Sequence, residues 1–365
     1  MLPFIVILSG AILCATGTWL IQRWFLARGF VDRPGGHKGH TQPVVLGGGV
    51  AVTLAVVVPM LAGLLVAGLI EDHPPEWFPA DLAPHLKGIV AKTPLAIAIV
   101  VCAGVMCLVG LADDRRPLPV TFRLAVQLII ALVLVVGFDL RLLSHLPDMI
   151  SMAVSVLWIL TLTNAMNFLD NMDGLSTGVA TIAAAVFGIA ATLAGQIFVP
   201  TCCWLIVGAL LGFLPFNFHP ARIYLGDAGS TVIGFLLAVM TILTTFVDPA
   251  IGPRPFGVIT PLVVMAVPLY DTGSVFFLRW RSGIPIWTGD RRHFSHRLLR
   301  RGMTVPKAVL VIWLATLVTS LPALILPKVD SWFHASVIMA QTLLVVALVA
   351  ILESSGPHAK APTKP

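Results

Sequence analysis

The sequence predicts an all-α polytopic integral membrane protein that crosses the bilayer about eleven times. Hydrophobic residues make up 58% of the 365 residues and charged residues only 11%, whereas an average globular protein carries about 25% charged residues. The apolar residues also gather in blocks close to the roughly 20 residues that a helix needs to span a bilayer. These two observations exclude a water-soluble enzyme.

Eleven apolar segments are predicted to be the spans. They cover residues 3–22, 44–70, 89–111, 120–138, 147–168, 176–195, 198–215, 229–246, 257–278, 304–326 and 332–352. Residues 1–353 then form a single transmembrane domain. Residues 354–365, which are polar and rich in proline, form a disordered tail.

Positive charge predicts which way the spans run. If the N-terminus lies outside and the spans alternate, 18 of the 23 Lys and Arg residues fall inside; the other five are Lys87, Lys92, Arg141, Arg254 and Lys328. Because cytoplasmic loops carry the excess of Lys and Arg, we expect the N-terminus outside and the C-terminus in the cytoplasm. The net charge of +6 follows from this asymmetry and indicates membrane lipid as a partner, and no nucleic acid.

The five cysteines all lie in apolar segments and show no Cys-x-x-Cys spacing. We therefore expect buried free thiols, and neither a disulfide nor a zinc site.

Most of the aspartates fall on the predicted inner side. They are Asp32, Asp113, Asp114, Asp170, Asp173, Asp227, Asp271 and Asp290. Ionisable groups at the membrane are costly and mark functional sites, and carboxylates beside arginines suit a metal ion and a phosphorylated substrate. For any single aspartate, ordinary charge at a helix end explains the position equally well.

Two segments group these polar residues. Asp113 and Asp114 end the third predicted span, and Arg123 lies near the start of the next. Asn164, Asn167 and Asp170 follow one another at intervals of three, which places them in one stripe on a helix. Polar contacts between helices are the alternative explanation, but Asp173 continues the stripe beyond the membrane edge, which favours a site.

Asp227 lies between small residues just before the eighth predicted span. Small neighbours allow a ligand to approach, and amides at a helix N-terminus favour anions. Capping of the helix is the alternative role, and the two roles are compatible.

The last large inner loop, residues 279–302, carries seven arginines together with His293 and His296. Contact with anionic lipid would explain the arginines without any binding site, but it explains the two histidines less easily. The His-x-x-His spacing lacks further metal ligands, so phosphate recognition by arginine and histidine is the preferred interpretation.

Seven motifs in order give this chain a family resemblance. They are VDRPGGHKGH with LGGG, GLADDRR with Arg123, NAMNFLDNMDGL, GFLPFN, IYLGDAGSTVIGF, PLYD and DRRHFSHRLLRRG, between residues 31 and 302. The set resembles the polyprenyl-phosphate N-acetylhexosamine-1-phosphate transferase family, and within it the bacterial undecaprenyl-phosphate GlcNAc-1-phosphate transferase branch.

The resemblance implies a reaction and a location. A sugar 1-phosphate would pass from a UDP-N-acetylhexosamine to undecaprenyl phosphate, releasing UMP and leaving a lipid-linked diphosphate sugar for cell-envelope glycans such as lipopolysaccharide O-antigen. Mg²⁺ would be required, with Mn²⁺ as the alternative ion. The enzyme would be a multi-pass protein of the bacterial inner membrane with its active site on the cytoplasmic face; a homodimer is compatible with the sequence but not indicated by it.

The resemblance also implies roles for residues of these motifs. Asp227 and Asn167 would bind Mg²⁺. Asp113 and Asp114 would position or deprotonate the lipid phosphate, with Arg123 as its clamp.

Other motif residues would contact the nucleotide sugar. Asp170 and Asp173 would shape the nucleotide side, with Asn164 in the same polar stripe. The residues expected to hold diphosphate, sugar or substrate phosphate are Arg292, His293, His296, Lys38 and His40.

This chain departs from the family pattern at two positions. Ser295 stands where the last loop usually has the middle histidine, and serine can donate a hydrogen bond but cannot carry positive charge. Asn171 stands where glycine is more usual.

Two other functions fit parts of the sequence. A transporter also uses polar groups within spans, but the acids here gather at one membrane face and no inverted repeat is evident. A phospho-MurNAc-pentapeptide transferase belongs to the same family, but its last loop usually carries three consecutive histidines, unlike the segment at 293–296.

Overall fold

The computed structural model describes residues 2–32, 43–76, 78–244, 255–285 and 292–354. The predicted site residues Lys38 and His40 and the predicted tail beyond residue 354 lie outside these ranges. The long helices are α1 (Leu2–Ala27), α2 (Gly48–Ile70), α4 (Thr93–Arg115), α5 (Val120–Gly137), α6 (Asp148–Leu169), α7 (Leu175–Leu193), α8 (Phe198–Asn217), α9 (Gly226–Leu243), α13 (Val305–Ala323) and α14 (Trp332–Ser354).

Shorter elements connect them. The short helices are α3 (Leu86–Ala91), α10 (Thr260–Val264), α11 (Ala266–Arg281) and α12 (Phe294–Arg300), with single 3₁₀ turns η1 (Ala83–His85), η2 (Pro255–Ile259) and η3 (Leu326–Lys328). Two antiparallel strands, β1 (Val31–Asp32) and β2 (Val44–Val45), form a small hairpin.

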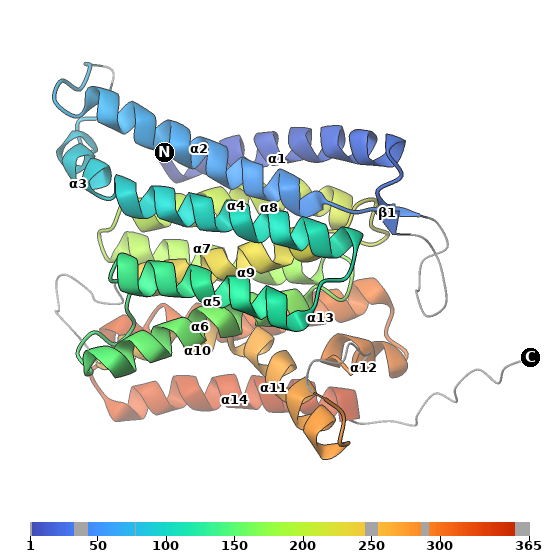
Figure 1. Ribbon diagram of the computed structural model, residues 1–365. Helices are drawn as coiled ribbons and strands as arrows, with labels where there is room; N and C mark the ends of the chain where they lie inside the picture. Colours follow the sequence, from blue (N-terminus) through green and yellow to red (C-terminus); the bar gives the residue numbers. More distant parts are fainter. Residues whose placement is uncertain (1, 33–42, 77, 245–254, 286–291, 355–365) are drawn as a thin grey trace, which may run out of the picture.

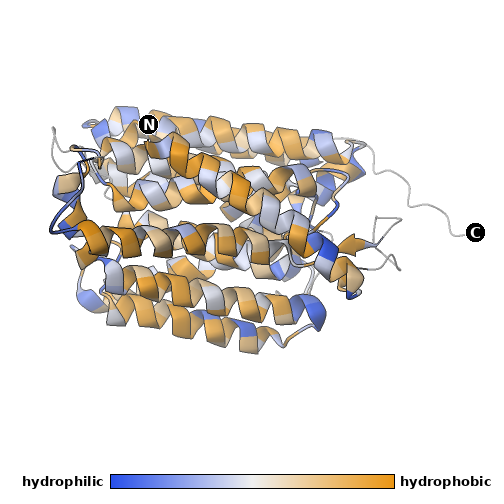
Figure 2. Cartoon of the chain, turned by 90° about the horizontal axis from the view of Figure 1, so that it is seen from above, coloured by the Kyte–Doolittle hydropathy of each residue, from blue (hydrophilic) through white to orange (hydrophobic). Residues whose placement is uncertain are grey.

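The predicted fold class is confirmed. Among the described residues, ten helices are long and apolar enough to cross a membrane, or eleven if one bent pair counts as a span. The helices run side by side in a bundle (Figure 1), with apolar residues along their length and polar residues toward the two ends (Figure 2). The predicted second span begins four residues late, at Gly48, because residues 44–45 pair with β1.

The ninth predicted span is broken. Its two parts, Phe256–Val264 and Ala266–Arg281, meet at an angle of 66°. Pro268 lacks the N–H that would bond to the carbonyl of Val264 four residues earlier, which favours a break in the helix at this point. The hydroxyl of Ser320 on α13 donates to that carbonyl instead, at 3.4 Å.

Helix α9 lies at the centre of the bundle. In its apolar stretch 78% of the residues are buried, against 17% in that of α1 and 22% in that of α14. Every residue from Ala228 to Thr241 is buried, as expected for a helix surrounded by others. Helices α2, α4, α6 and α7 all pack against it. The residues at its start are therefore held from several directions.

The start of α2 is joined to the segment that precedes α9. The N–H groups of Gly48 and Gly49 donate to the carbonyls of Tyr224 and Leu225 at 3.0 and 2.9 Å, and Val45 bridges to Ile223. These bonds satisfy amides that a helix N-terminus leaves without partners. They fix the loop that leads into α9.

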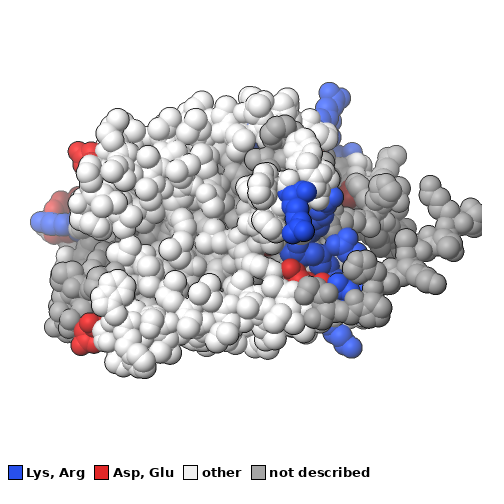
Figure 3. Space-filling model, turned by 90° about the horizontal axis from the view of Figure 1, so that it is seen from below, with Lys and Arg blue, Asp and Glu red and all other residues white. Residues whose placement is uncertain are grey.

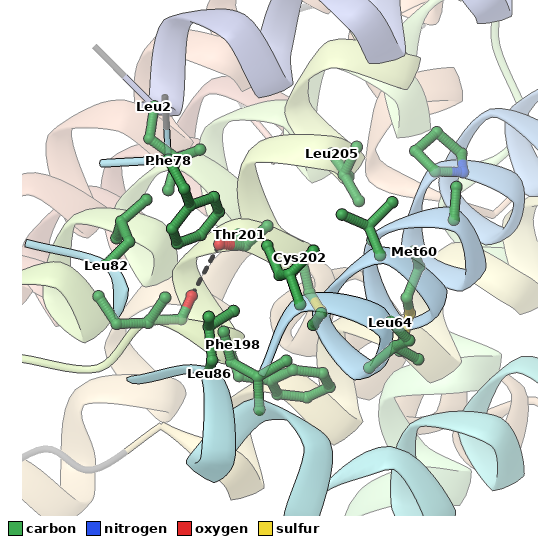
Figure 4. Close-up of a pocket in the computed structure, with 18 residues that line it drawn as sticks. Leu2, Met60, Leu64, Phe78, Leu82, Leu86, Phe198, Thr201, Cys202 and Leu205 are labelled. Atoms are coloured by element: carbon green, nitrogen blue, oxygen red, sulfur yellow. Dashed lines mark hydrogen bonds between the residues drawn. The ribbon is translucent and has the colours of Figure 1, made fainter. Parts of the chain in front are cut away.

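An apolar cavity of about 400 Å³ lies at the opposite end of the bundle, between α1, α2, α8 and the connection before α4 (Figure 4). Leu64, Phe78 and Leu86 are among its lining residues. The hydroxyl of Thr201 faces it but donates to the carbonyl of Ile197 at 2.8 Å. All five cysteines are buried and unpaired, as expected from the sequence.

Glycines let α2 approach α9 closely. A Cβ at Gly49 would lie 2.1 Å from the backbone nitrogen of Gly229 on α9, whereas a Cβ at Gly63, on the same helix, would meet nothing within 4 Å. We predict that Gly49→Ala destabilises the protein by about 1–3 kcal/mol, because the backbones of α2 and α9 must move apart. Thermal melting in detergent measures the effect.

Gly63→Ala is the matched control, since it adds the same methyl group to the same helix. It should leave the melting temperature unchanged or raise it slightly, because alanine favours a helix over glycine by about 1 kcal/mol. Equal melting temperatures for the two variants would contradict the close packing of α2 on α9.

Candidate active site

Three carboxylates from distant parts of the sequence meet at one end of the bundle. Asp113 and Asp114 lie in the last turn of α4, and Asp227 lies in the first turn of α9. Arg123 and Asn167 are hydrogen-bonded to them. We call these five residues the carboxylate cluster.

Asp114 caps helix α9. Its Oδ1 accepts the N–H of Asp227 at 2.8 Å, and its Oδ2 accepts the N–H of Ala228 at 3.2 Å. The residue at the N-cap of α9, Leu225, has no side chain able to do this. The negative charge also lies at the positive end of the helix dipole. Asp114 therefore fixes the position of Asp227.

Gly226 makes this contact possible. A Cβ there would lie 2.5 Å from Oδ2 of Asp114, and the residue has a φ of 69°, which favours glycine. Gly110 plays a similar part on α4, where a Cβ would lie 2.5 Å from the backbone of Asp227 and Ala228. The two helices touch without intervening side chains.

Arg123 joins two of the aspartates. Its Nη1 donates to Oδ2 of Asp113 at 2.6 Å and to Oδ2 of Asp227 at 3.0 Å. Asp113 also accepts the N–H of Leu118 at 2.5 Å, which fixes the turn between α4 and α5. The arginine side chain is 30% exposed. The positively charged guanidinium of Arg123 therefore lies between two carboxylates, at a point that a ligand can reach.

The polar stripe on α6 supplies two asparagines. Nδ2 of Asn167 donates to Oδ1 of Asp227 at 2.8 Å and to the hydroxyl of Ser230 at 3.0 Å. One turn away, Nδ2 of Asn164 donates to Oε1 of Gln127 on α5 at 2.7 Å. Asn164 therefore lies one turn from Asn167 on α6 and joins that helix to α5.

A polar pocket of about 250 Å³ adjoins the cluster. Asp170, Asn171, Asp173 and Tyr224 line it, together with Asp227. Burial raises the pKa of Asp170 well above its usual range, and the carboxylates of Asp227 and Asp114 raise it further. Burial, reinforced by nearby aspartates, raises the pKa of Tyr224 to about 12, so its phenol stays neutral.

Asp173 and Asn217 hold the wall of this pocket together. Oδ2 of Asp173 accepts the N–H of Ala221 at 3.1 Å and lies 2.7 Å from Nδ1 of His219. Oδ1 of Asn217 accepts the hydroxyl of Thr177 at 2.7 Å. The loop after α6 and the loop after α8 are thus fixed to one another.

The histidine segment lies against α11. His293 is buried, and its Nδ1 lies 2.7 Å from Oδ2 of Asp271, whose Oδ1 accepts the N–H of Phe294 at 2.9 Å. Nη1 of Arg292 donates to the hydroxyl of Ser282 at 2.8 Å, at the end of α11. His296 is half-buried on α12.

The end of α14 also holds α12. Nε of Arg297 donates to Oε2 of Glu353 at 2.9 Å, and the hydroxyl of Tyr270 donates to Oε1 of the same carboxylate at 2.7 Å. Nη2 of Arg297 further donates to Ser274 on α11 at 2.7 Å. Three helices are joined through this one ion pair.

The structure thus brings most of the predicted site residues into one region. Asp113, Asp114, Arg123, Asn167 and Asp227 are joined by hydrogen bonds. Asp170 and Asp173 share a pocket with Asp227. His293 and Arg292 are hydrogen-bonded to α11 and its end, and the ring centre of His293 lies 6.1 Å from that of Phe168 on α6.

Four residues of the site were missed by the sequence reasoning. They are Gln127, Asn217, Tyr224 and Ser230. Three of them lie within the quoted motifs or directly beside a motif aspartate, which is a signal that could have found them. Gln127 lies one helical turn after Arg123 in a predicted span, and a polar residue there is itself a signal.

The donor atoms of the cluster suit Mg²⁺. Nδ2 of Asn167 donates to Asp227 and Ser230, which leaves the carbonyl oxygen of this amide as its atom able to bind a metal ion. Within the described ranges, no three His, Cys, Asp or Glu residues are arranged as a metal site. Mg²⁺ is compatible with this arrangement, since it takes oxygen ligands and is held by one or two carboxylates with water and substrate phosphates.

Part of the chain matches a known protein family. Residues 96–245, which include the whole carboxylate cluster, match the model of glycosyl transferase family 4. A "Probable undecaprenyl-phosphate N-acetylglucosaminyl 1-phosphate transferase" of Bacillus subtilis is 27% identical over 93% of this chain and 88% of its own.

Two further relatives agree. A decaprenyl-phosphate N-acetylglucosaminephosphotransferase of Mycolicibacterium smegmatis is 33% identical over 84% of this chain and 78% of its own. An undecaprenyl-phosphate alpha-N-acetylglucosaminyl 1-phosphate transferase of Escherichia coli K12 is 29% identical over 79% and 74%. None of the three is named as a phospho-MurNAc-pentapeptide transferase or a transporter. The chain therefore belongs to glycosyl transferase family 4, in the branch of the undecaprenyl-phosphate N-acetylglucosamine-1-phosphate transferases.

Proposed function

We propose that this protein transfers N-acetylglucosamine 1-phosphate from UDP-N-acetylglucosamine to undecaprenyl phosphate. The products are UMP and a lipid-linked diphosphate sugar for the synthesis of a cell-envelope glycan. The observation that carries the proposal is the carboxylate cluster: Arg123 bridges Asp113 and Asp227 beside a polar pocket at the end of apolar helices. The names of the relatives supply the substrates.

The polar pocket is the proposed site of the nucleotide. Tyr224 contributes an aromatic ring to the lining, and Asp170 and Asp173 contribute carboxyl groups that can form hydrogen bonds with a nucleotide. Since Asp227 also lines this pocket, a diphosphate bound there would extend toward the carboxylate cluster.

The reaction is a phosphoryl transfer. An oxygen of the lipid phosphate attacks the β-phosphorus of the nucleotide sugar, and the bond between that phosphorus and the oxygen of the α-phosphate breaks, which releases UMP. A phosphate monoester has its second pKa near 6, so most of the lipid phosphate is dianionic at neutral pH. Positioning and charge neutralisation are then the main tasks of the protein.

Each residue of the cluster has a part in these tasks. The guanidinium of Arg123, partly exposed, clamps the attacking phosphate. Asp113 orients that guanidinium, and Asp114 holds Asp227 in place through the amides of α9. Asp227 and the carbonyl oxygen of Asn167 would hold Mg²⁺. When bound, the ion neutralises charge on the diphosphate and on the leaving UMP.

The protein is proposed to span the inner membrane of a bacterium, with its active site on the cytoplasmic face. The predicted excess of Lys and Arg on the inner side supports this orientation. On the face seen in Figure 3, Lys and Arg gather at one end of the molecule, the end at which β1 lies in Figure 1.

Activity tests the proposal directly. Purified protein in detergent, given Mg²⁺, undecaprenyl phosphate and a panel of UDP-sugars, should release UMP fastest with UDP-N-acetylglucosamine, and chelator should abolish the release. Asp227→Asn should lower kcat by about 100-fold or more, because it removes the carboxylate that would hold Mg²⁺ beside the diphosphate. Asp148→Asn, which changes an exposed aspartate on the other end of α6, should leave kcat unchanged.

Release of UMP in the presence of chelator, or by Asp227→Asn at the wild-type rate, would refute the metal assignment. No release with any UDP-sugar, together with substrate uptake into proteoliposomes, would instead favour a transporter.

The neighbouring aspartates should respond differently to the same substitution. Asp114→Asn keeps one acceptor oxygen but sets an NH₂ group against the second of the two backbone amides, so the free energy of unfolding should fall by about 1–3 kcal/mol, with loss of activity. Asp113→Asn keeps an acceptor for Leu118 and should lower kcat with little change in melting temperature. Thermal melting and UMP release measure both effects. Equal melting temperatures for the two variants would argue against capping by Asp114.

Reporter fusions test the orientation. Alkaline phosphatase fused after residue 354 should be inactive and a fluorescent protein at the same place should fluoresce, because both report a cytoplasmic C-terminus. Active phosphatase at this position would place the C-terminus outside and reverse the proposed orientation.

A further inference from the structure

A hydrogen bond joins the polar pocket to helix α12. The hydroxyl of Ser295 donates to Oδ1 of Asn171 at 2.5 Å, and Nδ2 of Asn171 donates to the carbonyl of Phe168 at 2.7 Å. Because a backbone carbonyl can only accept, Nδ2 must face Phe168 and Oδ1 must face Ser295. The orientation of the Asn171 amide is therefore determined by its surroundings.

One partner of this bond lies in the polar pocket and the other on α12. Asn171 lines the polar pocket between Asp170 and Asp173. Ser295 is fully buried on α12, in the segment that carries His293 and His296. The two residues are 124 positions apart in the chain, and they are also the two positions at which the motifs depart from the family pattern.

The other anchors of α12 lie away from the pocket. Asp271 on α11 holds its first residues, and Glu353 on α14 holds Arg297. Asn171 is different because it belongs to the lining of the pocket itself. Its bond to Ser295 fixes α12 at a defined position relative to Asp170, Asp173 and Asp227.

We propose that Asn171 and Ser295 are a coupled pair of positioning residues that hold α12 against the polar pocket and thereby set the affinity for the UDP-sugar. This inference rests on the proposed function, in which the pocket binds the nucleotide. The pair lies outside the carboxylate cluster, so its loss should weaken donor binding far more than it slows the chemical step.

A double-mutant cycle tests the pair. Asn171→Ala and Ser295→Ala should each raise KM for UDP-N-acetylglucosamine about tenfold, the size expected when a buried hydrogen-bonding group loses its partner. The value of kcat should stay within about threefold of wild type. The double variant should be no worse than the single variants, because either substitution already removes the bond.

Binding of UDP alone gives a second measurement that does not depend on turnover. Its Kd should rise about tenfold in both single variants. Ser320→Ala is the matched control, since it removes a fully buried hydroxyl from α13, where it contacts Val264 and not the pocket. It should leave KM and Kd unchanged. Should Ser295→Ala fail to fold, as judged by thermal melting, Asn171→Ala carries the test.

Three results would overturn the coupled pair: effects of the single variants that multiply in the double variant, a fall in melting temperature or kcat with KM and Kd unchanged, or a rise in KM of equal size in Ser320→Ala. A wild-type protein that binds UDP but releases no UMP would refute the proposed function instead, and the Kd values would still decide the role of the pair.

Discussion

The contact between the end of α4 and the start of α9 is the constraint on which the rest of the site depends. A charged carboxylate at the membrane edge is costly unless it is paired, and Asp114 is paired with the amides of Asp227 and Ala228. With α9 fixed in this way, Asp227 meets Arg123 from α5 and Asn167 from α6. Glycines at positions 110 and 226 provide the space that this contact needs.

Much of this architecture could be predicted from the sequence, because membrane spans are determined by local composition. The helix ends agree with the predicted spans within a few residues, except where Val44 and Val45 join a hairpin and where Pro268 breaks a helix. The residue types and spacing also indicated the carboxylate cluster, since charged groups among apolar ones are few and costly. Its pairings could not be predicted, because they join residues as many as 113 positions apart.

The positions of the histidine segment show where local reasoning ends. Sequence motifs indicated His293 and Arg292 as phosphate ligands, and the structure adds partners that the motifs do not show: Asp271 on α11 for the histidine, and Ser282 at the end of α11 for the arginine. A motif lists residues that belong to one region, and it does not say which of them face the pocket and which support the backbone. The bond between Asn171 and Ser295 is a further case, visible only once both segments are placed.

The ion pair between Arg297 and Glu353 has a consequence for biosynthesis. Helices α4 to α9, which carry the carboxylate cluster, are made and inserted well before α14 leaves the ribosome. Glu353, in contrast, is the penultimate residue of α14, and its carboxylate joins α12 and α11 to that helix. Since chains fold from the N-terminus as they are synthesised, the cluster can assemble early, but α12 gains its last anchor only when translation is almost complete. A nascent chain thus acquires its charged centre before the segment beside the pocket is secured.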